Sequence, residues 1–390
     1  MHSPNHLKSS FILIGLLFTM TNLLAQDFNI GHTSTSFYDA ERDRNISTEI
    51  YYPAENAGED VSAAEGNFPV LIFGHGFLMS WDSYENFWTE LVPEGYVICF
   101  PNTEMSLLPS HGDFGLDLRF LSNQMQEENE LESSLFFNIL RPETALMGHS
   151  MGGGASFLAA ENNSNITALV NFAAAETNPS AIAAAANITV PALLFSGEDD
   201  CVTPPNEHQN LMYENLASSC KTQISINQGI HCYFANDNFS CTLGESFCNP
   251  FPSINRDLQQ SITFTFLKIW LDAVLRNNES AFQLFNEGLD SSVQVTFSQD
   301  CSTTSIKEWS VEQEIKLFPN PSSNQLNIKL PEDCSEGNLI IYNSLAEKIL
   351  ERPMNQSSLI LDISHLPEGS YFIEFHANSV KYSSRFLKAD

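Results

Sequence analysis

Short runs of β-branched and aromatic residues alternate with longer helical stretches between residues 33 and 276. The short runs predict strands at residues 34–38, 46–52, 69–73, 96–100, 144–148, 168–172, 192–196 and 223–227. The longer stretches predict helices at residues 83–91, 113–126, 151–161, 205–218 and 254–275. Because strands that alternate with helices pair side by side through crossover connections, the pattern predicts an α/β fold with about eight mainly parallel strands.

The last 80 residues have a different pattern, in which short alternating runs are separated by turn signals after a polar stretch at 296–312. Such runs are typical of a small antiparallel β-sandwich. We therefore expect an α/β domain over residues 26–300, a linker at 301–312 and an all-β domain over 313–390.

The N-terminal segment carries Lys8, an apolar run at 11–20 and the small residue Ala25. This run is too short to cross about 30 Å of hydrocarbon, so residues 1–25 are predicted to be a cleaved signal peptide. The alternative is an N-terminal anchor that is not removed. No second run of 18 apolar residues follows, and we expect an exported chain without an integral membrane span.

Composition narrows the class of protein. Hydrophobic residues make up 43% of the chain, enough for a sizeable core, which excludes intrinsic disorder for most of it. The 48 acidic residues against 17 Lys and Arg residues give a net charge of -31. Such a charge repels phosphate backbones, so nucleic acid is not expected as a partner. Most of the acid excess lies in residues 26–310, where we interpret it as a solvated surface; selection of cationic substrates is the alternative.

All eight cysteines follow the predicted signal peptide and would meet an oxidising compartment, in which disulfides persist. Local spacing suggests that Cys201 pairs with Cys220 and Cys241 with Cys248, although eight thiols leave the connectivity open. Cys99 lies in an apolar run and is predicted to be a buried free thiol. Beyond the predicted signal peptide the chain has neither a CxxC nor an HxxxH pattern, and we expect no metal and no cofactor.

Residues 148–152, Gly-His-Ser-Met-Gly, match the pattern G-x-S-x-G between a predicted strand and a predicted helix. A sharp turn of this kind exposes the serine hydroxyl, and the start of the following helix favours developing negative charge. We therefore predict that Ser150 is a nucleophile. A chance glycine-rich turn is the alternative.

A serine hydroxyl becomes a nucleophile only when a histidine takes its proton and a carboxylate orients that histidine. In this architecture the chain order is Ser, acid, His. His365 and His376 belong to the predicted second domain, which leaves His208 and His231. We favour His231 as the base because it follows the last predicted strand, whereas His208 falls in a predicted helix. A surface or structural histidine is the alternative.

Three consecutive acids, Glu198, Asp199 and Asp200, follow the strand predicted at 192–196. We favour Asp200 over Asp199 because Pro204 fixes the turn directly after it and starts a helix. The remaining acids are interpreted as solvated loop residues.

A glycine turn at residues 74–77 follows the third predicted strand. In this position the backbone N–H groups of Phe77 and Met151 are expected to face a developing oxyanion. An ordinary tight turn is the alternative. Phe77 and Trp81 are candidates for the apolar wall of a substrate cleft, but Trp81 and Trp88 fit equally well as core under a helix. The connection at 173–191 is too short for a lid.

Residues 148–154 and 200–204 resemble the elbow and the acid loop of cutinase-like and bacterial polyesterase members of the α/β-hydrolase superfamily. The turn at 74–77 is similar to that of chlorophyllase-like and platelet-activating-factor-acetylhydrolase-like esterases. The resemblance covers residues 31–290 and implies an α/β-hydrolase fold there and a catalytic triad of Ser150, Asp200 and His231. Residues 173–178 lack the Trp that polyesterases carry after the corresponding strand, which argues against binding of aromatic polyesters.

The C-terminal residues resemble a type IX secretion sorting domain, with an opening motif at 316–321, a central motif at 362–371 and a basic closing strand at 381–388. The resemblance implies passage across an outer membrane, followed by release or attachment to the cell surface. The type IX secretion machinery is then a partner, and removal of the sorting domain is left open.

The leading hypothesis is an exported serine carboxylic-ester hydrolase that works through an acyl-enzyme and acts on soluble, polymeric or other bulky esters. An amidase or a peptidase would use the same residues. A surface-displayed binding protein that retains the fold without turnover is a further alternative. The natural substrate and the oligomeric state do not follow from the sequence.

Overall fold

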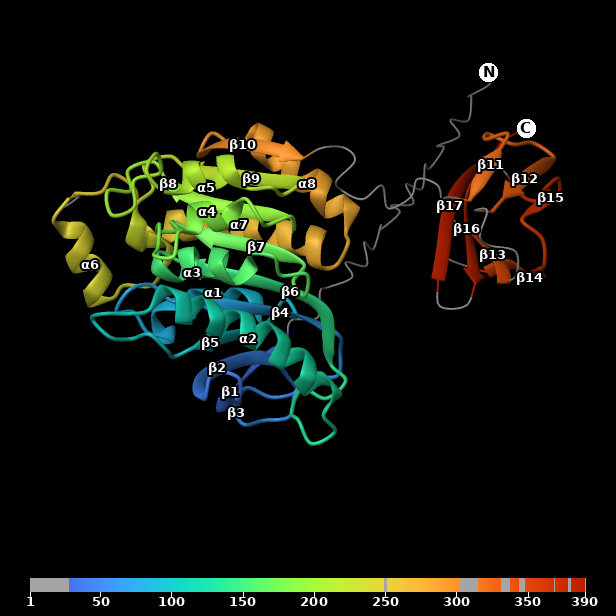
Figure 1. The fold of residues 1–390 in the computed structure, drawn as a ribbon. Coiled ribbons are helices and arrows are strands. Elements are labelled where there is room, and N and C mark those ends of the chain that lie inside the picture. The colour runs from blue at the N-terminus through green and yellow to red at the C-terminus, as the bar shows by residue number, and fades with distance from the viewer. Residues whose placement is uncertain are drawn as a thin grey trace, which may run out of the picture. The chain divides into compact units, whose positions relative to one another are not determined.

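The computed structural model describes residues 28–248, 251–301, 315–330, 337–343, 348–367, 369–377 and 380–389 (Figure 1). The predicted signal peptide and residues 302–312 of the predicted linker lie outside the described residues. The chain divides into two compact units, Met1–Asp300 and Cys301–Asp390, and each is considered by itself.

The first unit is built on a ten-stranded sheet with the order β10-β9-β8-β7-β6-β4-β5-β2-β1-β3. Its strands are β1 (Asn29–Asp39), β2 (Arg44–Ala54), β3 (Gly58–Glu59), β4 (Phe68–Gly74), β5 (Val97–Pro101), β6 (Leu140–His149), β7 (Ala168–Phe172), β8 (Ala192–Gly197), β9 (Cys220–Ile226) and β10 (Val295–Cys301). Neighbouring strands from β5 to β9 run parallel, whereas β1, β2 and β5 pair antiparallel. The predicted α/β fold class is confirmed.

Two strands of this sheet were not expected from the sequence. β3 has two residues, too few for a pattern, and β10 begins next to the polar stretch that we assigned to the end of the domain. Both lie at the edges of the sheet, where strands need little apolar sequence.

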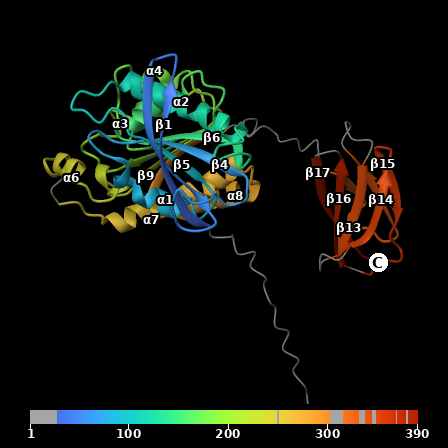
Figure 2. The same cartoon turned by 90° about the horizontal axis from the view of Figure 1, so that it is seen from below.

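Helices cover both faces of the sheet. They are η1 (Trp81–Tyr84), α1 (Glu85–Leu91), α2 (His111–Glu130), α3 (Met151–Ala160), α4 (Ala181–Ala185), α5 (Gln209–Asn215), η2 (His231–Phe234), α6 (Phe239–Ser246), α7 (Arg256–Leu275) and α8 (Glu279–Ser291). Helices α1, α7 and α8 lie on one face of the sheet and α2, α3 and α4 on the other (Figure 2). Buried side chains of α5 pack on the same face as those of α2. The central strands are therefore buried from both sides.

The second unit contains a three-stranded and a four-stranded sheet, in the orders β11-β12-β15 and β14-β13-β16-β17. Their strands are β11 (Lys316–Phe318), β12 (Gln325–Lys329), β13 (Gly337–Asn343), β14 (Lys348–Met354), β15 (Ser358–Asp362), β16 (Gly369–Ala377) and β17 (Val380–Lys388). The strands within each sheet pair antiparallel, and both sheets contribute to one apolar core. This confirms the predicted all-β second domain.

The suggested disulfide pairings are wrong. Cys201 pairs with Cys248, and Cys241 pairs with Cys232. Cys201 lies after the end of β8, whereas Cys220 is the first residue of the neighbouring parallel strand β9. The two cysteines therefore lie at opposite ends of these strands and cannot meet. Cys220 is nevertheless disulfide-bonded, as is Cys301. Cys99 is a buried free thiol, as predicted, and burial raises its pKa.

The backbones of β4 and α3 lie in close contact, and this contact positions the turn that contains Ser150. A Cβ atom on Gly152, at the start of α3, would lie 2.1 Å from the carbonyl oxygen of Gly74 at the end of β4. A Cβ atom on Gly148 would lie 2.3 Å from the carbonyl oxygen of Gly152. Because these neighbours are backbone atoms, no side chain can move aside to make room. Glycine here lets β4, β6 and α3 pack in direct contact.

We expect Gly152→Ala to lower the free energy of unfolding by about 3 kcal/mol or more, because the added methyl group forces two backbone segments apart. The matched control is Gly244→Ala in α6, where a Cβ atom meets nothing within 4 Å. There the better helix propensity of alanine should raise stability by up to about 1 kcal/mol. Urea unfolding of both variants measures the difference, and equal stabilities would contradict the close approach.

Candidate active site

The predicted nucleophile Ser150 lies in the turn between β6 and α3. Its φ of 54° is a strained value for a residue with a side chain and places it in the geometry of a nucleophile elbow. The Ser150 N–H donates to the carbonyl of Phe172 (3.0 Å), and the Ser150 carbonyl accepts from the N–H of Ala175 (2.9 Å). These bonds hold the turn against the end of β7.

Asp200 follows β8 and is 4% exposed. Its Oδ1 accepts the N–H groups of Val202 (2.9 Å) and Thr203 (2.8 Å), which fixes the carboxylate in a tight turn. Its Oδ2 lies 2.8 Å from Nδ1 of His231. Burial alone would raise the pKa of Asp200, but its contacts with His231 and Thr203 outweigh burial, and the pKa is lowered.

His231 begins η2, in the loop after β9, and is 2% exposed. Because an ionised carboxylate can only accept, the ring nitrogen that faces Asp200 carries the proton and Nε2 has a free lone pair. Burial lowers the pKa of His231, but the charges of Asp200 and Glu245 outweigh burial and the pKa is raised from 6.5. The ring is thus arranged to take a proton at Nε2.

The structure therefore brings Asp200 and His231 together. The ring of His149, the residue before Ser150, lies beside the ring of His231, with centroids 4.8 Å apart. Among the described residues, neither the Ser150 hydroxyl nor Nε2 of His231 has a hydrogen-bond partner. Contacts of this kind are often long in a site without substrate and tighten in the complex. The other candidate base, His208, uses its Nδ1 to accept the N–H of Glu176 (2.9 Å).

Two residues of this site have no signal in the sequence. The Thr203 hydroxyl lies 2.9 Å from Oδ2 of Asp200 and 3.0 Å from Nδ1 of His231. Glu245, on α6, accepts the N–H of His231 (2.9 Å) and the N–H of Cys232 (3.0 Å) with its two carboxylate oxygens. Burial raises the pKa of Glu245. The disulfide between Cys232 and Cys241 attaches α6 to the same segment.

The predicted oxyanion donors lie on the two glycine turns. Met151 is the first residue of α3, where an N–H has no acceptor within the helix, and Phe77 follows Gly76 in the turn after β4. Within the described part of the chain, neither N–H has a hydrogen-bond acceptor. Phe77 is 45% exposed. Trp81 is half-buried and packs against Trp88, with ring centroids 5.5 Å apart, so it also contributes to the core.

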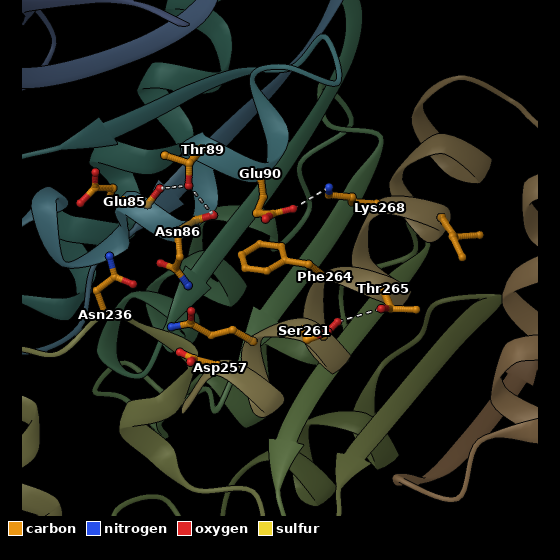
Figure 3. Close-up of a pocket in the computed structure, with 12 residues that line it drawn as sticks. Glu85, Asn86, Thr89, Glu90, Asn236, Asp257, Ser261, Phe264, Thr265 and Lys268 are labelled. Atoms are coloured by element: carbon orange, nitrogen blue, oxygen red, sulfur yellow. Dashed lines mark hydrogen bonds and ion pairs between the residues drawn. The ribbon is translucent and has the colours of Figure 1, made fainter. Parts of the chain in front are cut away.

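A groove of about 710 Å³ lies elsewhere, between α1 and α7 (Figure 3). Its lining includes Asn86, Phe264 and an ion pair between Lys268 and Glu90 (2.6 Å). None of the predicted site residues lines it. Among the described residues, no group of three or more His, Cys, Asp and Glu side chains could hold a metal ion.

Comparison with known proteins adds family information. A family model described as PET hydrolase-like matches residues 42–248, and one described as a secretion system C-terminal sorting domain matches residues 316–389. The second match confirms the predicted export through the type IX system, to the cell surface or beyond. Within the described residues, no helix is long and apolar enough to cross a membrane.

Two curated relatives are similar to about half of the chain. Cutinase est1 of Thermobifida alba is 23% identical over 201 residues, which are 50% of this chain and 60% of that protein. Bis(hydroxyethyl) terephthalate hydrolase of Streptomyces coelicolor is 24% identical over 186 residues, which are 47% of this chain and 54% of that protein. The chain thus spans between half and two thirds of the length of these relatives.

The charges around His231 predict how its pKa responds to substitution. Glu245→Gln removes one of the two charges that raise it, and we expect the pKa of His231 to fall relative to the wild type. The ring of His149 lies beside that of His231, and His208 is close enough for its charge to act on His231; both have lowered pKa values and stay neutral near pH 7. Glu198→Gln is the matched control.

Glu198 is exposed and accepts the N–H of Gln228, so this control should leave the pKa of His231 unchanged. Titration of the histidine ring signals by NMR measures both variants. An unchanged or higher pKa of His231 in Glu245→Gln would contradict the assigned contacts.

Proposed function

The chain belongs to the PET hydrolase-like family, and from this premise we propose that it is an exported serine hydrolase that cleaves carboxylic esters. The observation that carries the proposal is the 2.8 Å contact between Asp200 and His231, next to the strained turn of Ser150. The three residues lie after β8, β9 and β6, which end at the same edge of a parallel sheet. That edge is where such folds assemble their sites.

In the proposed reaction the Ser150 hydroxyl attacks the ester carbonyl while Nε2 of His231 takes its proton. Asp200 holds the ring and stabilises the imidazolium. The N–H groups of Phe77 and Met151 stabilise the tetrahedral oxyanion, each by about 3 kcal/mol. The carbon–oxygen bond to the alcohol then breaks and His231 returns the proton to the leaving alkoxide. Water attacks the acyl-enzyme by the same route and releases the acid.

We further propose that the substrates are bulky or polymeric esters. Support comes from α6 and the residue that follows it, where the side chains at four-residue spacing, Phe239, Leu243 and Phe247, are 81%, 45% and 83% exposed. The opposite side of this helix carries Cys241 and Glu245, which bind the His231 segment. From residue 238 to 255 only Glu245 is charged, and it is buried. An uncharged apolar surface attached to the base suits a long apolar substrate.

The domain assignment completes the proposal. We propose that residues 1–25 are removed on export, that residues 26–300 are the hydrolase domain and that residues 313–390 are recognised by the type IX machinery. The match over 316–389 supports the last assignment.

We expect Ser150→Ala to abolish covalent labelling by a fluorophosphonate and to lower kcat on short p-nitrophenyl esters by about a thousandfold or more. Ser164→Ala, at an exposed serine of a loop, is the control and should label like the wild type. A wild-type protein that neither labels nor hydrolyses any ester would refute the proposed function.

The paired substitution Phe239→Ser and Phe247→Ser should slow hydrolysis of aliphatic polyester particles about tenfold, which is roughly 1.4 kcal/mol of lost binding. It should change the rate on a short soluble ester by less than about twofold, because the triad is untouched. The control is Val293→Ser, an apolar side chain that is 88% exposed outside α6. Equal losses on both substrates would show instead that α6 supports the site structurally.

A further inference from the structure

A chain of buried hydrogen bonds connects the two sides of the candidate site. The N–H of Gly76 donates to the hydroxyl oxygen of Tyr84 (2.7 Å). That hydroxyl lies 3.0 Å from Nδ1 of His149, and Nε2 of His149 lies 3.1 Å from the carbonyl oxygen of His231. Tyr84 and His149 are both 0% exposed.

The directions of these bonds follow from the chemistry of the groups. A carbonyl oxygen only accepts, so Nε2 of His149 carries the proton. Its other nitrogen, Nδ1, then accepts. The Tyr84 hydroxyl has one proton and donates it to this nitrogen in preference to the weakly accepting Sδ of Met79, which lies 3.5 Å away. The hydroxyl oxygen remains free to accept the N–H of Gly76. Every group in the chain therefore has a partner, with one consistent tautomer.

The surroundings fix the chain in place. The ring of Tyr84 packs against the ring of Phe73, with centroids 4.7 Å apart. A Cβ atom on Gly76 would lie 3.1 Å from the Tyr84 hydroxyl and 3.3 Å from Nδ1 of His149. The absence of a side chain at Gly76 thus lets the backbone reach the tyrosine and the histidine together.

We propose that Tyr84 and His149 form a positioning bridge for the ester hydrolysis assigned above, on which this inference rests. Each end of the bridge adjoins a reacting group: Gly76 precedes Phe77, and His149 precedes Ser150. The far end holds the backbone of His231. The bridge therefore sets the oxyanion turn, the nucleophile and the base relative to one another, and neither of its side chains takes part in a chemical step.

The bridge keeps its protonation state while the base changes. Burial, together with the neighbouring His231, lowers the pKa of His149 to about 3. Burial also raises the pKa of Tyr84. Both groups stay neutral when His231 takes a proton, so the hydrogen bonds of the bridge are the same in every step.

Tyr84→Phe tests the bridge because it removes one oxygen atom and leaves the ring. On a short p-nitrophenyl ester we expect kcat to fall about tenfold while KM stays within about twofold, since a misplaced oxyanion donor weakens the transition state and not substrate binding. The affinity for a boronic acid, which forms a tetrahedral adduct with the serine, should fall by the same factor. In the pH dependence of kcat, the midpoint on the acid side, which reports the protonation of His231, should stay unchanged.

Tyr96→Phe is the matched control. Tyr96 is a second buried tyrosine, 1% exposed, whose hydroxyl has no hydrogen-bond partner among the described residues, and its loss should leave kcat unchanged. The double variant Tyr84→Phe with His149→Phe should lose no more activity than the worse single variant, because either change breaks the same bridge. Melting temperatures identify variants whose whole fold is destabilised.

The outcomes are separable. A Tyr84→Phe enzyme with wild-type kcat, a loss confined to KM, or single losses that multiply in the double variant would overturn the bridge while the wild-type activity still supports the proposed function. An inactive wild type would overturn both. Ring-nitrogen NMR adds a readout that needs no activity: His149 should remain the neutral Nε2–H tautomer from pH 5 to 9, and a titrating His149 would overturn the bridge.

Discussion

Direct contact between two backbone segments is the constraint on which this site depends. Gly152 of α3 meets Gly74 of β4 at a distance that leaves no room for a methyl group. Because β4 and α3 cannot slide past each other there, the turn after β4 and the turn of Ser150 have a fixed separation. The sheet around them is covered on both faces, which makes its carboxyl edge a rigid support for loops that carry polar groups.

Asp200 and His231, the proposed acid and base, are held in place by disulfides. Cys201 follows Asp200 and is bonded to Cys248, while Cys232 follows His231 and is bonded to Cys241. Both partner cysteines belong to α6 or to the turn after it. One short helix segment therefore clamps the two loops, and Glu245 adds two hydrogen bonds from the same helix. Such a clamp suits an exported protein, because disulfides persist in an oxidising compartment.

Local sequence patterns predict features that depend on few neighbouring residues. The strand, the turn and the helix around Ser150 follow from such a pattern. The choice of Asp200 rests on the turn before Pro204, and the choice of His231 on its place after a strand. The partners of these residues depend on tertiary folding. Glu245 lies in α6, a helix that the sequence pattern does not predict, and no spacing connects it to the backbone N–H of His231. The cysteine pairs also depend on tertiary folding. Cys201 and Cys220 are near each other in the sequence, but the sequence does not show that they lie at opposite ends of two neighbouring parallel strands.

Two histidines with adjacent rings show how partners, rather than burial, assign roles in this site. His149 and His231 are both buried and their ring centroids lie 4.8 Å apart. Burial lowers the pKa of each. At His231 the carboxylates of Asp200 and Glu245 outweigh burial, whereas at His149 the charge of Asp200 does not. His149 instead contacts the His231 carbonyl through Nε2 and the Tyr84 hydroxyl through Nδ1, and a neutral ring makes both hydrogen bonds. The same side chain thus becomes a group that can take a proton at one position and a fixed neutral connector at the other.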